Sequence, residues 1–383
     1  MAQPVFFIST CEFSGDMHGA VLIEALKKID SQAEFYGIGG AKMAASGMEL
    51  LADPTNQSTI GFIEVLKNIR KMRKLLDQII IIWEKKRPDL VIWLDSGGFN
   101  LFLAKAAKER GIPVVCMFSP SAWAYAQERA VKLAERVSLL LAVLPFEADF
   151  YRKFGTKVTY IGHPLLDSVQ TTCEPALMRQ ELGVSSEEKM VLLMPGSRWQ
   201  EIQKLLPIML ATVRELNQSL QIKWVLPIAA SLDKKWLESL VANAQVPITL
   251  VQGGVYDLMA AADAAVITSG TATLEAAILD LPMVVIYRIN WLSSLIYRIL
   301  EAEEHRGKPL LVGLPNLIMQ RKVLPELLQA KLKHQNLTNE LRKILEDEQE
   351  SKRLRIELAK VRELIGPSGV MDRAAQLIFE LLG

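Results

Sequence analysis

The chain has 383 residues, 50% of them hydrophobic and 23% charged, and its 44 basic side chains nearly cancel its 43 acidic ones. This length predicts two domains, because a single hydrophobic core rarely serves more than about 250–300 residues. The composition excludes a disordered chain, and the near-zero net charge argues against a general nucleic-acid binder. Cys11, Cys116 and Cys173 lie too far apart for a disulfide framework or a zinc site, which fits a reducing compartment.

The N-terminal segment carries no targeting signal that we can identify. It has no basic region, and its apolar run Val5–Ile8 is too short for the core of a signal peptide. No stretch reaches the roughly 18 apolar residues that a spanning helix needs. We therefore expect a soluble, cytoplasmic protein, and leave contact with a membrane surface open.

In the first half of the chain, short apolar runs alternate with longer helical patterns. The expected strands are 5–9, 34–37, 90–94, 114–118, 139–143 and 158–161. The expected helices are 18–30, 62–86, 100–110 and 145–154. Such alternation predicts a parallel sheet covered by helices on both faces.

A polar segment, 168–189, separates this series from a second one. The second series of expected strands is 191–194, 223–227, 248–251, 264–268 and 283–287, and the chain is helical from about 336 onward. We expect an α/β protein with two Rossmann-like parallel-sheet domains, 1–167 and 168–366, that face a cleft. The C-terminal helix within 367–383 could pack back on the first domain. Ligands of such sheets bind beyond the carboxyl ends of the strands.

The loop that follows the first expected strand is the first candidate site. Small residues between Ser9 and Gly19 allow a tight turn and leave helix N–H groups free for an anionic or hydroxyl-rich ligand. Glu12, Ser14 and Asp16 supply polar side chains there. The alternative is a plain turn in which Ser14 or Asp16 caps the helix.

Asp95 follows a very apolar strand and precedes two glycines, which would admit a ligand closely. A carboxylate at that edge would be partly desolvated, and the resulting rise in pKa would suit a general base. Alternatively, Asp95 caps the following helix. The Gly37–Gly40 turn lacks the full dinucleotide-binding spacing, so we expect no nicotinamide cofactor. His163 either contacts a ligand or marks the hinge between the domains.

Two turns in the second half are suited to bind anions. Gly196, Ser197 and Arg198 lie between a strand and a helix, where the guanidinium can bind phosphate oxygens beside a helix N-terminus. Ser269, Gly270 and Thr271 repeat this arrangement, with N–H groups that would face a diphosphate.

Glu275, one turn into the second of these helices, could accept hydrogen bonds from ribose hydroxyls. The alternative is a capped helix with Glu275 exposed to solvent.

The expected helix at 62–86 combines an apolar stripe with a basic face. The candidate membrane contacts on it are Ile63, Leu66, Lys67, Ile69, Arg70, Met72 and Lys74. Such a helix can lie on an anionic lipid surface. It can equally be an ordinary amphipathic helix with a solvated basic face.

Many ordered blocks of the sequence resemble the lipid-A-disaccharide synthase family, whose members are glycosyltransferases of the two-Rossmann B-type fold. Among them are CEFSGDMHGA, PDLVIWLDSGGFN, IGHPLLD, LMPGSRWQEI, TSGTATLEAAILDLPMVVIYR and LPNLIMQRKVLPELLQ. The resemblance implies transfer of 2,3-diacylglucosamine from its UDP derivative to 2,3-diacylglucosamine 1-phosphate. The product would be a β-1,6-linked disaccharide, formed with inversion and without a metal or other cofactor.

The resemblance also assigns residues and partners. The family's base falls on Asp95, and its first loop on Glu12, Ser14 and Asp16. Its UDP-binding positions fall on Arg198, Ser269–Thr271, Glu275, Asn316 and Gln329. It implies a peripheral location on the cytoplasmic surface of the inner membrane, and it leaves a homodimer open.

The chain departs from the family at Cys11, Gly97-Gly98 and Tyr125, all in the acceptor half. Two other functions remain open. One is a B-type enzyme that acts on a soluble UDP-sugar, such as an epimerase. The other is a relative that binds nucleotide or lipid without turnover.

Overall fold

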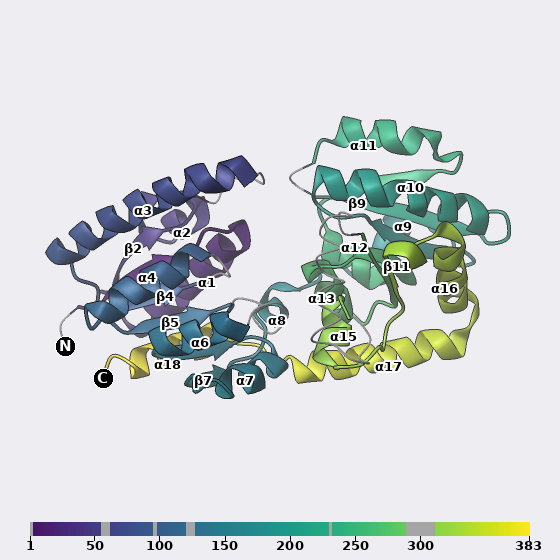
Figure 1. Cartoon of the computed structure of the whole chain (residues 1–383). Coiled ribbons are helices and arrows are strands. Elements are labelled where there is room, and N and C mark those ends of the chain that lie inside the picture. Colours follow the sequence, from purple (N-terminus) through teal and green to yellow (C-terminus); the bar gives the residue numbers. More distant parts are fainter. Residues whose placement is uncertain (1–2, 55–61, 95–97, 120–126, 230–231, 289–310) are drawn as a thin grey trace. The chain divides into compact units, whose positions relative to one another are not determined.

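The computed structural model describes residues 3–54, 62–94, 98–119, 127–229, 232–288 and 311–383 (Figure 1). At residues 62–70, 127 and 243 it describes only the backbone. The chain divides into two compact units. Unit 1 comprises Met1–Leu166 and Ile365–Gly383, and unit 2 comprises Asp167–Leu364.

The described strands of unit 1 form one parallel sheet of seven strands in the order β3-β2-β1-β4-β5-β6-β7. The strands are β1 (Val5–Ser9), β2 (Glu34–Ile38), β3 (Glu49–Ala52), β4 (Leu90–Trp93), β5 (Val114–Met117), β6 (Leu139–Ala142) and β7 (Val158–Tyr160). The strand order reverses between β1 and β4. A reversal of this kind opens a crevice at the carboxyl edge of a parallel sheet.

Helices cover both faces of this sheet. They are α1 (Phe13–Ile29), α2 (Ala41–Ala45), α3 (Phe62–Lys85), α4 (Gly98–Glu109), α6 (Gln127–Arg136), α7 (Pro145–Arg152), α8 (Leu165–Ser168, at the boundary) and α18 (Val370–Glu380). Successive strand residues point to opposite faces. Phe6 of β1 accordingly meets Phe379 of α18, with ring centroids 5.6 Å apart, while Phe7 meets Trp83 of α3 at 5.2 Å. The C-terminal helix therefore belongs to the core of unit 1.

The described strands of unit 2 form a second parallel sheet of six strands, in the order β10-β9-β8-β11-β12-β13. The strands are β8 (Lys189–Met194), β9 (Ile222–Ile228), β10 (Ile248–Gln252), β11 (Ala264–Thr268), β12 (Met283–Tyr287) and β13 (Glu326–Leu328). Here the order reverses between β8 and β11.

The helices of unit 2 are α9 (Pro175–Glu181), α10 (Trp199–Leu216), α11 (Lys234–Val241), α12 (Val255–Ala261), α13 (Thr271–Ile278), α15 (Leu314–Ile318), α16 (His334–Glu346) and α17 (Glu348–Leu364), with 3₁₀ turns at Ala242–Ala244 and Gln329–Lys331. Each helix that follows a strand begins at the carboxyl edge of the sheet. Several helix N-termini therefore gather at that edge, where N–H groups without intrahelical acceptors are available.

Two parallel α/β sheets were expected, and this prediction is confirmed. The expected central strands lie within one or two residues of their observed bounds, whereas β3, β13, α2 and α6 were not expected. In the part of the chain that the structure describes, no helix is long and apolar enough to cross a lipid bilayer.

Candidate functional site

Unit 2 contains a cavity of about 660 Å³ at the carboxyl edge of its sheet. Its walls are the segments that follow β8, β9, β10 and β11, so it lies where the strand order reverses. It is lined by Met194–Arg198, Glu201, Pro227–Ala229, Gln252–Val255, Thr268–Ala272 and Glu275. Seven residues expected at the nucleotide site meet here: Gly196, Ser197, Arg198, Ser269, Gly270, Thr271 and Glu275. Their contact with a ligand remains a prediction.

The turn after β8 brings an arginine to the cavity. Gly196 has a φ of +115°, and a Cβ there would lie 2.3 Å from Oε2 of Glu201, so the turn requires glycine. Arg198 is the N-cap residue of α10, and its side chain is 75% exposed. Its Nη1 lies 2.8 Å from Oε1 of Glu201. The guanidinium thus stands at the cavity, held at one nitrogen and otherwise accessible.

The turn after β11 presents the N-terminus of α13 to the cavity. Gly270 is the N-cap residue, with a φ of +157° and no side-chain cap, and a Cβ there would meet nothing within 4 Å. The N–H groups of Thr271 and Ala272 begin the helix and have no acceptor within it. The Thr273 hydroxyl donates to the carbonyl oxygen of Gly270 (2.7 Å), which fixes the turn.

Ser269 differs from the sequence-based expectation. Its N–H was expected to face a diphosphate, but it donates to the carbonyl oxygen of Ile286 (2.9 Å). Its hydroxyl donates to the carbonyl oxygen of Val312 (2.7 Å). Ser269 therefore attaches the turn to the segments at Ile286 and Val312. The N–H donors at this end of the cavity are those of the first turn of α13.

Glu275 is half-buried in the cavity wall, and the hydroxyl of Tyr256 donates to its Oε1 at 3.1 Å. Burial raises the pKa of Glu275 above its ordinary value, while the hydrogen bond from Tyr256 lowers it. The carboxylate is thus an oriented acceptor inside the cavity.

Thr268 also lines the cavity and was not identified from the sequence. It is 8% exposed, and its hydroxyl has no hydrogen-bond partner among the described residues. A buried hydroxyl without a partner is costly, so such a group at a cavity indicates a polar ligand. No sequence signal distinguishes Thr268 from any other strand-end threonine.

Asn316 and Gln329 were expected to contact the nucleotide, but neither lies among the residues that line the cavity. Asn316 is fully buried, and its side-chain oxygen accepts from the N–H groups of Val323 (2.7 Å) and Leu324 (2.9 Å). Its side-chain nitrogen donates to the carbonyl oxygen of Leu324 (3.1 Å) and to Oε1 of Glu326 (2.8 Å). All the hydrogen bonds that this amide can make are therefore used within the protein.

Glu326, which accepts from Asn316, also binds the backbone of the segment before α15. Its carboxylate accepts from the N–H groups of Gly313 (2.8 Å) and Val312 (3.2 Å), and burial raises its pKa. The carbonyl oxygen of Val312 also accepts from the hydroxyl of Ser269, which lines the cavity. The segment 312–316 therefore supports the cavity wall without lining the cavity. Asn316 thus has a structural role in this arrangement. Gln329 is half-buried, with a φ of +49°.

In unit 1, the expected site residues follow β1 and β4, the two strands between which the order reverses. Glu12 is the N-cap residue of α1, and Glu12 and Ser14 are both exposed. Asp95, the expected base, lies outside the described residues. The structure resumes at Gly98, where α4 begins.

Asp16 is buried and bonded to the backbone of another helix. Its carboxylate accepts from the N–H groups of Gly40 (2.8 Å), Met43 (3.0 Å) and Lys42 (3.1 Å). Gly40 is the N-cap residue of α2, and Lys42 and Met43 lie in its first turn, which a carboxylate stabilises. Asp16 was expected to bind substrate or to cap its own helix, and instead it caps α2.

Two histidines of unit 1 are neutral at pH 7. The ring of His18 stacks on Phe118, with centroids 4.5 Å apart, and burial lowers the pKa of His18 to about 4. Burial and the proximity of His18 lower the pKa of His163 to about 3. Nδ1 of His163 accepts from the N–H of Leu165 (3.2 Å), and the N–H of His163 donates to the carbonyl oxygen of Ile365 (2.9 Å). His163 thus helps to attach the returning C-terminal segment.

The expected basic, apolar helix is α3, which begins at Phe62. The side chains of Ile63, Leu66, Lys67, Ile69 and Arg70 lie outside the described part of the chain. Met72 is partly buried against the core of unit 1, so its apolar character is explained without a membrane. Lys74 is exposed.

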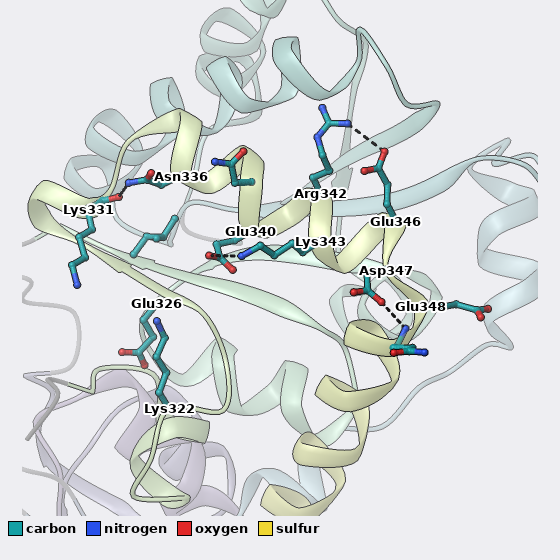
Figure 2. Close-up of a pocket in the computed structure, with 13 residues that line it drawn as sticks. Lys322, Glu326, Lys331, Asn336, Glu340, Arg342, Lys343, Glu346, Asp347 and Glu348 are labelled. Carbon is teal, nitrogen blue, oxygen red and sulfur yellow. Dashed lines mark hydrogen bonds and ion pairs between the residues drawn. The ribbon is translucent and has the colours of Figure 1, made fainter.

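A larger cavity, of about 1020 Å³, lies beside β13 between Lys322 and the helices α16 and α17 (Figure 2). Four of the charged residues that line it form two ion pairs with one another. Lys343 binds Glu340 (3.3 Å) and Arg342 binds Glu346 (3.3 Å). It lies away from the reversal of the strand order, and it brings together none of the expected site residues. Within the described ranges, no group of three or more His, Cys, Asp or Glu side chains is placed to hold a metal ion.

Comparison with known proteins finds relatives that match this chain over nearly its whole length. A sequence model of the family described as lipid-A-disaccharide synthetase matches residues 6–378. The lipid-A-disaccharide synthase of Syntrophus aciditrophicus is 37% identical over 384 residues, which covers 100% of this chain and 99% of that protein.

Solved structures with the same fold are more distant in sequence. The glycotransferase of kitacinnamycin has a TM-score of 0.66 at 15% identity, over 100% of both chains. The S. aureus MnaA–UDP co-structure has a TM-score of 0.63 at 14% identity, and the match covers 99% of this chain and 97% of that one. Both show the two-Rossmann B-type fold. The family match over residues 6–378 and the 37% identity to a relative along the whole chain establish that this protein belongs to the lipid-A-disaccharide synthase family of glycosyltransferases.

Proposed function

We propose that the chain transfers 2,3-diacylglucosamine from its UDP derivative to 2,3-diacylglucosamine 1-phosphate, with inversion at the anomeric carbon and release of UDP. The observation that carries this proposal is the cavity of unit 2. In this member of the family, Arg198, the first turn of α13 and Glu275 line one cavity. The cavity lies at the carboxyl edge of a parallel sheet, where the order of the strands reverses. That is where open α/β sheets bind nucleotides.

The donor's UDP occupies this cavity in our proposal. Its diphosphate lies between the Arg198 guanidinium and the N–H groups of Thr271 and Ala272, where the helix dipole favours negative charge. Its ribose lies against Glu275. The S. aureus MnaA–UDP co-structure, which has the same fold, supports UDP as a ligand of this chain.

The same groups would stabilise the leaving group. As the bond between the anomeric carbon and the diphosphate breaks, negative charge grows on the leaving phosphate. Arg198 and the N-terminus of α13 are already in place around it, so they need not reorganise during the reaction. The hydroxyl of Thr268, which has no partner among the described residues, is a further donor to the diphosphate.

Asp95 would act as the general base. The acceptor's primary hydroxyl must lose a proton as it attacks the anomeric carbon, and a carboxylate can take that proton. Such catalysis typically contributes about 10²–10⁴-fold. Asp95 follows β4 in the sequence, and β4 is one of the two strands between which the order of the sheet reverses, which supports this role. Glu12 and Ser14, exposed at the start of α1, would bind polar groups of the acceptor.

Both substrates carry acyl chains, so the enzyme must reach them at a bilayer. We assign this contact to the first part of α3, which carries Lys67, Arg70 and Lys74 on an amphipathic helix. A basic amphipathic helix binds anionic lipid through both its apolar and its charged face. The contact would place the chain peripherally on the cytoplasmic surface of the inner membrane.

The deciding experiment is mass spectrometry of products from the purified full chain. With UDP-2,3-diacylglucosamine and 2,3-diacylglucosamine 1-phosphate, we expect a disaccharide 1-phosphate and one UDP released for each product molecule. An isomer of the donor formed without UDP release would indicate an epimerase instead. Binding of UDP with neither product would indicate a relative without turnover. A reaction without the acceptor measures donor hydrolysis.

A further inference from the structure

Two consecutive residues at the start of α12, Tyr256 and Asp257, bind different parts of unit 2. The Tyr256 hydroxyl donates to Oε1 of Glu275 in α13, at 3.1 Å. Glu275 lines the nucleotide cavity, and so do Gly253–Val255, which immediately precede Tyr256. The hydrogen bond therefore joins two separate segments of the cavity wall.

Asp257 fixes the helix turn that carries Tyr256. The N-cap residue of α12 is Gly254, which offers no side-chain cap. The buried Asp257 carboxylate instead accepts from the N–H (2.6 Å) and hydroxyl (2.7 Å) of Thr172 and from the N–H of Cys173 (3.1 Å). Three hydrogen bonds thus attach the first turn of α12 to the segment around Thr172, and Tyr256 extends from a braced helix end.

The contact with Tyr256 changes what Glu275 can do. A free carboxylate rotates about its last bond, and ordering it on binding costs conformational entropy. With Oε1 bound to Tyr256, the plane of the carboxylate is set, and Oε2 still has lone pairs for further donors. The same hydrogen bond favours the ionised form, against the effect of burial, which raises the pKa of this group. Tyr256 thus orients Glu275 and favours its ionised form.

We propose that Tyr256 is a positioning residue for nucleotide recognition, whose hydroxyl holds the Glu275 carboxylate so that it accepts hydrogen bonds from the ribose hydroxyls of a nucleoside diphosphate. Tyr256 acts through Glu275 and not by contact with the ligand. The inference rests on the proposed function, because it takes UDP to be the occupant of the cavity.

The test compares two ligands on two proteins by calorimetric titration. UDP and 2′,3′-dideoxyuridine diphosphate differ only in the ribose hydroxyls that Glu275 would bind. In the native chain we expect the dideoxy compound to bind about tenfold more weakly, as for the loss of one charge-assisted hydrogen bond. In Tyr256→Phe, UDP itself should bind about tenfold more weakly, and the two ligands should differ by about twofold or less. Such coupling identifies groups that act together.

The possible outcomes distinguish failure of this inference from failure of the proposed function. If the native chain does not bind UDP, the proposed function fails. If UDP binds and the tenfold preference over the dideoxy compound persists in Tyr256→Phe, the inference fails and the proposed function stands. A merely structural loss would weaken both ligands equally and would give this second result.

The matched control is Tyr36→Phe, which removes a hydroxyl that donates to the carbonyl oxygen of Lys86 in unit 1. It should bind both ligands as the native chain does. Phe keeps the aromatic ring at either position, so thermal unfolding should show both variants folded. Glu275→Gln supplies a second variant, because a neutral amide at this position should also reduce the preference for UDP over the dideoxy compound.

Discussion

Arg198 is the residue whose surroundings best fit a role in anion binding. It begins α10, it lines the cavity, and it forms an ion pair with Glu201 at 2.8 Å. An exposed pair of this kind contributes little to stability. The guanidinium can therefore exchange part of this contact for a diphosphate without loss of the fold.

Arg198→Ala should weaken UDP binding by roughly ten- to a hundredfold, as expected for the loss of hydrogen bonds between charged groups. Calorimetric titration measures this change, and the melting temperature should stay near that of the native chain. Arg342→Ala is a matched control, because Arg342 is also in unit 2 and pairs with Glu346, a glutamate four residues further along its helix. Native affinity in Arg198→Ala would contradict the phosphate assignment.

His163 leads to a prediction about stability and pH. Its pKa is lowered to about 3 in the folded chain, whereas an unfolded histidine titrates near 6.5. Below pH 6.5 the unfolded chain therefore takes up a proton that the folded chain does not, and stability falls as the pH falls. At pH 5 the loss from this one group is about 2 kcal/mol.

His163→Asn keeps an acceptor near the N–H of Leu165 and removes the titration. Urea-unfolding midpoints at pH 7.5 and pH 5 should therefore differ less in this variant than in the native chain. Equal acid sensitivity in His163→Asn and the native chain would show that this histidine does not control it.

At the scale of secondary-structure elements, the central strands could be predicted from the sequence because they are buried on both faces. Such strands read as continuous apolar runs rich in β-branched residues, as in Ala264–Thr268 and Met283–Tyr287. The strands that were missed, β3 and β13, lie at sheet edges. Their sequences, ELLA and ELL, contain no β-branched residue and resemble helix as much as strand.

The candidate site could be predicted from the sequence only where all the residues that form it belong to a single turn. Gly196 and Gly270 mark turns in the sequence, and both turns line the cavity. By contrast, Asp16 bonds to an N–H group 24 residues away, and the Tyr256 hydroxyl bonds to a carboxylate 19 residues away. Such pairings depend on how helices pack, so the local pattern that suggested a ligand for Asp16 could not indicate its actual partner.

The first part of α3 leads to a prediction about lipid binding. Lys67, Arg70 and Lys74 should each contribute about 1 kcal/mol to binding at an anionic surface. Replacement of all three by Glu should therefore lower the affinity for phosphatidylglycerol-containing vesicles, measured by co-sedimentation, by a factor of a hundred or more. High salt should weaken binding of the native chain in the same assay.

The matched control for α3 reverses Lys204, Lys234 and Lys235, which are exposed on α10 and α11 of unit 2. It changes the net charge by the same amount and should leave vesicle binding near the native level. An equal drop in both triple variants would mean that overall charge, and not α3, attracts the chain to lipid.

At the scale of the whole molecule, the two sheets repeat one design with different side chains. In each, three strands come before the order reverses, and the fourth pairs with the free side of the first: β4 beside β1 in unit 1, and β11 beside β8 in unit 2. The edge in unit 2 carries a cationic residue and an open helix N-terminus. The edge in unit 1 carries Glu12 at the start of α1, and Asp95 follows β4 in the sequence. In our proposal, donor binding and proton removal therefore belong to different units, and single substitutions should separate them.

Asp95→Asn should lower the rate of transfer by about 10²–10⁴-fold, the usual contribution of a general base, because an amide cannot take the acceptor's proton. Its affinity for UDP should stay within about twofold of native, since the described residues that line the proposed nucleotide cavity belong to unit 2. Asp89→Asn is the matched control: Asp89 accepts from the N–H of Val5 (2.8 Å) just before β4 begins, at the opposite edge of the same sheet. Transfer at the native rate in Asp95→Asn would remove this carboxylate from the reaction. Loss of UDP affinity together with transfer would instead mean that unit 1 takes part in binding the donor.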